Sequence, residues 1–328
     1  MNNKVVIICG PTATGKTALA LKLAEAVGGE IVSADSRQVY RGMDVGTGKG
    51  LPINLKSQIS NLKIRQEQLS YYEVGGVRIW LYDVVPPDRR FSVAEYVPLA
   101  KVVIKDIWER GKIPLIVGGT GLYIDSIFFE RETFGVLPDL SLRKELELKT
   151  VSGLVERLEK LNPEKLKAMN SSDRSNPRRL IRAIEVATCR IAASAEPPRN
   201  DYVAMDTTPL NPIYFGLTSS LSFLYKKIDE RVDAMVEDGL LTEIRELVSK
   251  YGWTAPGMSG IGYRQFQPYF ENKASLEECV ARVKFDTHAY ARRQMTWFKR
   301  NKNITWFDVG TRGLSDALEI NSIIKKLF

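Results

Sequence analysis

A chain of 328 residues, 44% hydrophobic and 26% charged, has the balance of a folded globular protein with room for a large core and a smaller domain. The apolar run near the start, Val5–Cys9, is too short for a signal peptide or a membrane span, so we expect a cytoplasmic protein without membrane contact. Three scattered cysteines and one histidine exclude a disulfide framework and a His-rich metal site. The net charge of +8 suggests a polyanionic partner.

The first part of the chain alternates strand and helix patterns. Short β-branched runs predict buried strands and apolar residues at helical spacing predict helices, giving strands at 5–9, 30–33, 79–84 and 115–117 and helices at 16–27 and 93–110. Such alternation predicts a parallel sheet with helices on both faces. Residues 50–78 are polar and weakly patterned, and we expect a surface excursion there.

From about residue 139 the pattern is helical, with helices expected at 139–149, 153–161 and 177–188 and a proline-rich connection at 193–212. A strand pattern returns at 213–217, followed by expected helices at 222–238, 240–251 and 276–299 and a strand at 305–307. The simplest interpretation is an α/β core formed by residues 1–130 and 200–328, with an all-helical domain inserted at 131–199.

A phosphate-binding motif follows the first expected strand. The residues GPTATGKT fit the pattern G-x-x-x-x-G-K-[ST] and open an expected helix, which is the context that the pattern requires. Backbone N–H groups of such a loop surround a phosphate, Lys16 neutralises its oxygens, and Thr17 ligates Mg²⁺ or hydrogen-bonds the phosphate. The motif predicts a phosphate site, without saying whose phosphate, at Gly10, Pro11, Thr12, Ala13, Thr14, Gly15, Lys16 and Thr17.

Asp35 follows the second expected strand. In a parallel sheet, the end of this strand lies at the same edge as the phosphate loop, so Asp35 is placed within reach of a phosphate-bearing substrate. The alternative is that Asp35 forms a turn or caps a helix, as many loop aspartates do.

Two basic clusters indicate a nucleic-acid partner. Each alone is more often a solvated helix face, but the second is interleaved with Trp297 and Phe298. The clusters are Arg174, Arg178, Arg179 and Arg182, and Arg292, Arg293, Lys299, Arg300 and Lys302.

Together these motifs resemble the tRNA dimethylallyltransferase (tRNA isopentenyltransferase) family. The matching segments occur in the family's order over nearly the whole chain: GPTATGKT at 10–17, SADSRQVYRGMDVGTGK at 33–49, VGGTGLY at 117–123, NPRRLIRAIEV at 176–186, YFGLT at 214–218, IDERVDAMVEDGLLTEI at 228–244, GIGYRQ at 260–265 and ARRQMTWF at 291–298. The chain departs from many members at Arg78–Asp83, where a histidine-containing run is missing.

The resemblance implies a P-loop NTPase-like core whose loop binds the diphosphate of dimethylallyl diphosphate instead of ATP. The inserted helical domain would clasp the anticodon stem-loop of a tRNA. The implied reaction transfers a dimethylallyl group to N6 of adenine 37, in tRNAs that read codons beginning with U, with Mg²⁺ as cofactor. We expect a monomer.

The resemblance also assigns roles to residues. Asp35 matches the catalytic aspartate, which removes a proton from N6, and Thr17 and Arg231 match residues at the diphosphate. For Arg231, an ion pair on the helix surface is the alternative. Gln38 has the amide needed to read the edge of an adenine. The family's tRNA contacts match Asp35, Ser36, Arg37, Gln38, Thr120, Arg143, Arg178, Arg179, Leu180, Ile181, Arg182, Ser259, Gly260, Ile261, Gly262, Tyr263 and Arg264.

Other functions remain open at this point. A small-molecule P-loop kinase using ATP would explain the phosphate motif and the core, but not the DSRQVY segment or the basic helices. A non-catalytic, nucleotide-gated RNA-binding protein would not depend on Asp35. A member of the family with another isoprenoid donor is a third possibility.

Overall fold

The computed structural model describes residues 3–52, 55–64, 67–129, 136, 139–193, 210–310, 323 and 325. The chain divides into two compact units, one formed by Met1–Phe128 with Asp206–Phe328 and the other by Phe129–Met205. The helical insertion predicted at 131–199 lies within the second unit. Most of the predicted proline-rich connection, residues 194–209, lies outside the described residues. In the part of the chain that is described, no helix combines the length and the apolar character needed to cross a bilayer.

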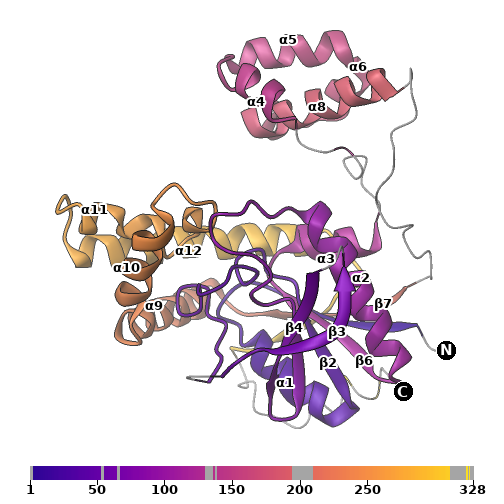
Figure 1. Ribbon diagram of the computed structural model, residues 1–328, viewed down its shortest axis with the longest axis vertical. Coiled ribbons are helices and arrows are strands. Elements are labelled where there is room, and N and C mark those ends of the chain that lie inside the picture. Colours follow the sequence, from indigo (N-terminus) through magenta and orange to yellow (C-terminus); the bar gives the residue numbers. More distant parts are fainter. Residues whose placement is uncertain are drawn as a thin grey trace. The chain divides into compact units, whose positions relative to one another are not determined.

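The first unit is built on a sheet whose described strands run in the order β3-β4-β5-β2-β6-β1-β7-β8 (Figure 1). From β5 to β8, neighbouring strands pair in parallel, so their carboxyl ends meet at one edge. The strands are β1 (Lys4–Cys9), β2 (Gly29–Ser33), β3 (Gln58–Ile64), β4 (Glu67–Val74), β5 (Val77–Trp80), β6 (Ile113–Gly118), β7 (Asn211–Thr218) and β8 (Thr305–Asp308).

The segment 50–78 is more regular than the expected surface excursion. Here β3 and β4 form an antiparallel hairpin, and β4 pairs with β5, so the hairpin continues the sheet. Its strand pattern is weak because this edge is largely solvated: the side chain of Ile59 on β3 is 73% exposed. A strand that is wet on both faces needs no alternation of apolar and polar residues.

Helices cover both faces of the sheet. Leu19 of α1 and Ile8 of β1 belong to one buried cluster. Ile7 is equally buried and points to the opposite face, since successive side chains of a strand alternate. That face packs against α2, which contacts β2 and β6. The helices are α1 (Lys16–Val27), α2 (Val93–Glu109) and α3 (Gly121–Phe128).

The C-terminal part of the first unit is helical, as predicted. Figure 1 shows these helices, in orange and yellow, gathered beside the sheet. The longest, α12, begins with a capping box in which Ser275 and Glu278 exchange hydrogen bonds. The elements are α9 (Leu221–Glu237), α10 (Leu240–Tyr251), the 3-10 turns η1 (Gly257–Ser259) and η2 (Arg264–Phe266), α11 (Gln267–Phe270) and α12 (Leu276–Phe298).

All elements described in the second unit are helices. Two short ones, α6 and α7, escaped the sequence analysis, although Asn162 and Asn170 cap their N-termini with side-chain oxygens. A cluster of leucines, including Leu154, Leu158 and Leu180, forms the core of this unit. The helices are α4 (Leu140–Glu147), α5 (Val151–Leu161), α6 (Pro163–Ala168), α7 (Ser171–Arg174) and α8 (Pro177–Ala193).

Candidate active site at the carboxyl edge of the sheet

The loop between β1 and α1 has the conformation that its glycines permit. Gly10 and Gly15 have φ values of 138° and 76°. A Cβ atom at Gly10 would lie 2.3 Å from the carbonyl oxygen of Leu217, so only glycine fits this close approach. Gly15 precedes an α1 N-terminus that has no side-chain cap and no acidic residue in its first turn. Its N–H groups and the helix dipole therefore favour an anion.

Lys16 bends back over this loop. Its Nζ donates a hydrogen bond of 2.6 Å to the carbonyl oxygen of Pro11. Burial and the nearby charge of Arg231 lower the pKa of Lys16 to about 8, while the charge of Asp35 opposes this shift. The ammonium group is thus held in an environment that lacks sufficient negative charge, as expected of a site for a phosphate.

Arg231 reaches the same loop from α9. Its Nη1 donates a 2.8 Å hydrogen bond to Oγ1 of Thr12. The alternative of an ion pair on the helix surface is wrong, since the guanidinium is directed inward to Thr12 and to the carbonyl oxygen of Thr47. Burial lowers the pKa of Arg231, and the charge of Asp35 raises it. Two cations and one carboxylate therefore share this edge of the sheet.

Asp35 follows β2 and forms a turn, as the alternative interpretation expected. Its Oδ1 accepts a 2.8 Å hydrogen bond from the backbone N–H of Arg37, so it shapes its own turn. Its negative charge also helps to raise the pKa of two tyrosines, Tyr290 and Tyr82. Burial, assisted by Asp35, raises the pKa of Tyr290 to about 12, and the same causes raise the pKa of Tyr82. These phenols stay protonated and can donate hydrogen bonds beside the carboxylate.

Gln38 is buried and both ends of its amide are engaged. Ser33 Oγ donates a 2.9 Å hydrogen bond to Gln38 Oε1, and Gln38 Nε2 donates to the carbonyl oxygen of Gly48 at 3.4 Å. An amide has two N–H groups and two acceptor lone pairs, so one of each is left after these contacts. If Gln38 reads the edge of an adenine, it uses the remaining N–H group and the remaining acceptor lone pair.

Other residues expected to contact tRNA are brought to the same edge. Thr120, after β6, accepts a 3.1 Å hydrogen bond from the backbone N–H of Ser36. Arg37 donates to Ser259 Oγ at 3.3 Å, which joins the segment after β2 to the segment 259–264. Within the latter, Ser259 and Arg264 are exposed, whereas Tyr263 is buried and offers no surface to an RNA.

Sequence reasoning missed one residue of this site. Gln294, on the buried face of α12, accepts a 2.9 Å hydrogen bond from the backbone N–H of Thr12 and donates one of 2.9 Å to the carbonyl oxygen of Gly119. It thereby links the phosphate loop to the turn after β6. Gln294 lies in the family segment 291–298, but only the fold shows which side of α12 faces the loop.

With this geometry in view, comparisons with known proteins are decisive. Residues 38–301 match the family model described as IPP transferase, and residues 3–67 match the one described as isopentenyl transferase. The chain belongs to the IPP transferase family. The resemblance seen in the motifs is confirmed.

Relatives and solved structures of this family agree. A tRNA dimethylallyltransferase of Roseiflexus sp. (strain RS-1) is 40% identical over 305 residues, which cover 92% of this chain and 91% of the relative. The full-length tRNA isopentenylpyrophosphate transferase of Bacillus halodurans is 33% identical with a TM-score of 0.67, covering 99% of this chain and 96% of that one. A eukaryotic dimethylallyltransferase, 24% identical with a TM-score of 0.73 over 98% of this chain and 80% of that one, shares the fold.

Two arginines of the second unit that are predicted to contact tRNA, Arg143 and Arg182, share one carboxylate in this IPP transferase. Arg143 binds both carboxylate oxygens of Glu185, at 2.6 and 2.8 Å, and Arg182 donates to one of them at 3.1 Å. Burial raises the pKa of Glu185, but the hydrogen bonds from Arg143 and Arg182 outweigh it and leave the pKa below its usual range. A phosphate bound by either arginine therefore has to compete with Glu185 for the N–H groups of the guanidinium.

The other predicted RNA contacts on α8 differ in burial: two are buried and two are exposed. Leu180 and Ile181 lie in the core of the second unit, so their predicted RNA contacts are wrong as far as the side chains are concerned. Arg178 and Arg179 are exposed on α8, and Arg179 pairs with Asp173. Exposed basic side chains are suited to a phosphate backbone.

The expectation of Mg²⁺ rests on the phosphate loop and not on a cluster of metal-ligating side chains. The described residues contain no cluster of three or more histidine, cysteine, aspartate or glutamate side chains that would enclose a metal. Mg²⁺ commonly keeps several waters and is bound through one or two protein oxygens plus substrate phosphates. Thr17, the residue expected to supply one such oxygen, is the second residue of α1 and directly follows Lys16.

Proposed function

We propose that this protein transfers a dimethylallyl group from dimethylallyl diphosphate to N6 of adenine 37 in the anticodon loop of tRNAs that read codons beginning with U. The relatives' names support the reaction. The observation that carries the assignment of residues is the meeting of Asp35, Lys16 and Arg231 at the carboxyl edge of the sheet, where Arg231 hydrogen-bonds the phosphate loop at Thr12 and the charge of Asp35 raises the pKa of both cations. The protein acts as a cytoplasmic monomer in this proposal.

The proposed chemistry uses the carboxylate and the two cations for opposite tasks. N6 of adenine is a weak nucleophile because its lone pair is delocalised into the ring. As N6 forms a bond to the allylic carbon, Asp35 accepts the proton that N6 loses. The C–O bond of the donor breaks and its electron pair leaves with the diphosphate, whose growing negative charge is stabilised by Lys16, Arg231 and the N–H groups of the P-loop.

Magnesium is part of the proposal. Held by Thr17 and the diphosphate, Mg²⁺ would neutralise phosphate charge. Burial lowers the pKa of Lys16 and Arg231, which supports a site whose cations gain negative charge when the diphosphate binds. The donor is thus bound by a P-loop NTPase-like core.

The inserted helical domain is proposed to bind the anticodon stem-loop. Exposed arginines of α8 would contact phosphates and orient the RNA. The adenine must leave its stack to reach Asp35, which costs a few kcal/mol and least in a single-stranded loop. This cost favours an anticodon-loop adenine over one in a duplex.

The test uses labelled dimethylallyl diphosphate and two anticodon stem-loops that carry A37 or G37. Label should enter only the A37 RNA. The variant Asp35→Asn should slow transfer by about 10²- to 10⁴-fold with RNA binding retained, while Asp88→Asn, at an exposed position of the same unit, should match the unaltered protein. Equal labelling of both RNAs, no labelling, or phosphoryl transfer from ATP would overturn the proposal.

A further inference from the structure

The loop Asp44–Lys49 touches two residues of the proposed site through its backbone. The carbonyl oxygen of Thr47 accepts a hydrogen bond from Nη2 of Arg231 at 3.4 Å. The next carbonyl, of Gly48, accepts from Gln38. A Cβ atom at Gly48 would lie 1.7 Å from Nη2 of Arg231, so the guanidinium packs directly on the loop. This loop and Thr12 together therefore position the guanidinium of Arg231.

Glu243, near the start of α10, holds the first half of the loop. Its Oε2 accepts hydrogen bonds from the backbone N–H groups of Asp44 and Val45 at 2.8 and 2.7 Å, and its Oε1 accepts one from Gly46 at 3.1 Å. The hydroxyl of Tyr263 donates a further 2.7 Å hydrogen bond to Oε1. One carboxylate thus fills a concave row of N–H groups, an arrangement whose hydrogen bonds are strengthened by the negative charge.

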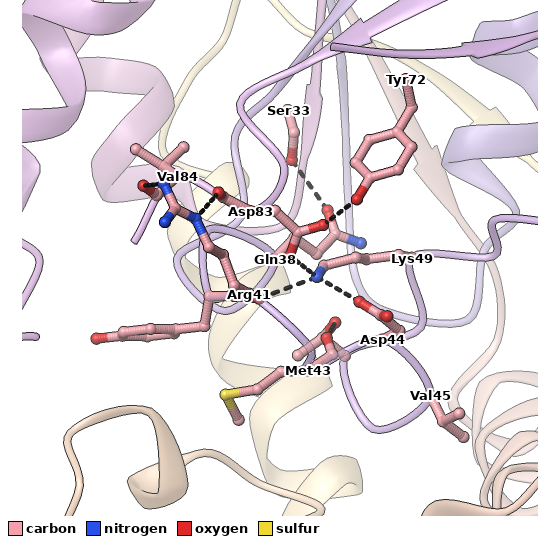
Figure 2. Close-up of polar contacts among 12 residues, drawn as sticks. Ser33, Gln38, Arg41, Met43, Asp44, Val45, Lys49, Tyr72, Asp83 and Val84 are labelled. Atoms are coloured by element: carbon pink, nitrogen blue, oxygen red, sulfur yellow. Dashed lines mark hydrogen bonds and ion pairs between the residues drawn. The ribbon is translucent and has the colours of Figure 1, made fainter. Parts of the chain in front are cut away.

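Lys49 holds the other end of the loop, as Figure 2 shows. Its side chain is buried, and Nζ contacts Asp44 at 2.6 Å, Asp83 at 2.5 Å and the carbonyl oxygen of Tyr40 at 2.9 Å. Tyr72 donates a hydrogen bond to the second oxygen of Asp83. The loop belongs to neither a helix nor a strand, so these contacts and those of Glu243 add to its own turn hydrogen bonds, from the N–H groups of Gly48 and Lys49, in fixing its backbone.

We propose that Glu243 is a positioning residue for the transfer reaction. It contacts neither Asp35, which accepts the proton in the proposed reaction, nor the phosphate loop that holds the donor. It fixes Asp44–Gly46, which keeps Thr47 and Gly48 against Arg231 and thereby orients the cation that stabilises the departing diphosphate. The inference rests on the proposed function and adds a residue on α10 that the phosphate motif and the DSRQVY segment do not contain.

The experiment compares Glu243→Gln with Glu246→Gln, an exposed glutamate on the same helix, in the transfer assay. In Glu243→Gln, the amide nitrogen replaces one acceptor and faces backbone N–H groups, so the loop shifts. We expect kcat to fall about 10- to 100-fold, as misplacement by about 1 Å does elsewhere. The KM for the stem-loop should stay within about twofold, and Glu246→Gln should match the unaltered protein.

A double-mutant cycle separates positioning from a general loss of structure. If Glu243 acts through Arg231, Glu243→Gln should add little to the loss of kcat caused by Arg231→Gln, because the cation is already gone. Additive losses, or a Glu243→Gln enzyme as fast as Glu246→Gln, would overturn the inference. If Glu243→Gln does not fold, Tyr263→Phe removes only one contact to Glu243, and the same criteria apply to it. Failure of the unaltered protein to transfer label refutes the proposed function instead.

Discussion

The low pKa of Lys16 makes the affinity for diphosphate depend on pH in a predictable way. Burial and Arg231 bring this pKa from 10.5 to about 8 in the ligand-free protein. A diphosphate interacts favourably with the protonated form only. Protonated Lys16 falls from about nine-tenths of the molecules at pH 7 to about one-tenth at pH 9, so its contribution to binding should weaken about tenfold over this range.

Calorimetric titration with inorganic diphosphate from pH 7 to pH 9 tests this prediction. The ligand has its own titration, but that cancels in the ratio of the affinities of the unaltered protein and Lys16→Met. The ratio should fall about tenfold between the two pH values. Lys22→Met, at an exposed position of α1, is the matched control and should leave the pH profile unchanged. A constant ratio would show that Lys16 keeps its ordinary pKa, and the account of its environment would be wrong.

Two further predictions concern the first unit, one at the amino ends of its strands and one at the phosphate loop. Burial raises the pKa of Glu30, but hydrogen bonds from Arg110, Trp80 and Lys112 outweigh it and lower this pKa from 4.5 to about 2. Glu30 should therefore contribute about 3 kcal/mol of stability above pH 4.5, which is lost as the pH falls towards 2. Urea unfolding can be followed by tryptophan fluorescence, which reports the first unit because all 5 tryptophans lie there. The difference in the free energy of unfolding between the unaltered protein and Glu30→Gln should disappear in acid. Gly10→Ala should reduce diphosphate affinity at least tenfold, because its Cβ displaces the P-loop from β7; unchanged affinity would contradict the geometry of this loop.

Local sequence patterns determined most of the elements and the phosphate loop of this protein. The helix predicted at 16–27 has the observed bounds, because its glycines and apolar spacing act within a few residues. The eight residues of the phosphate motif likewise depend on neighbours in the chain. The hairpin β3–β4 escaped prediction because β3 is largely exposed, with Ile59 73% exposed, and only Leu69 and Tyr71 of the described side chains of β4 are buried, so neither strand carries a strong apolar pattern.

Contacts between distant parts of the chain were decided by the tertiary structure alone. Gln294 meets Thr12 across 282 residues, and Glu243 meets Asp44 across 199. These residues lie in segments that resemble the family, but the match does not show which of them meet, since a hydrogen bond between remote segments leaves no periodic pattern. Packing likewise placed Leu180 in a core, beside arginines that the motif alone had grouped with it as RNA contacts. Sequence thus determined which groups the protein carries, whereas the fold decided which of them face one another.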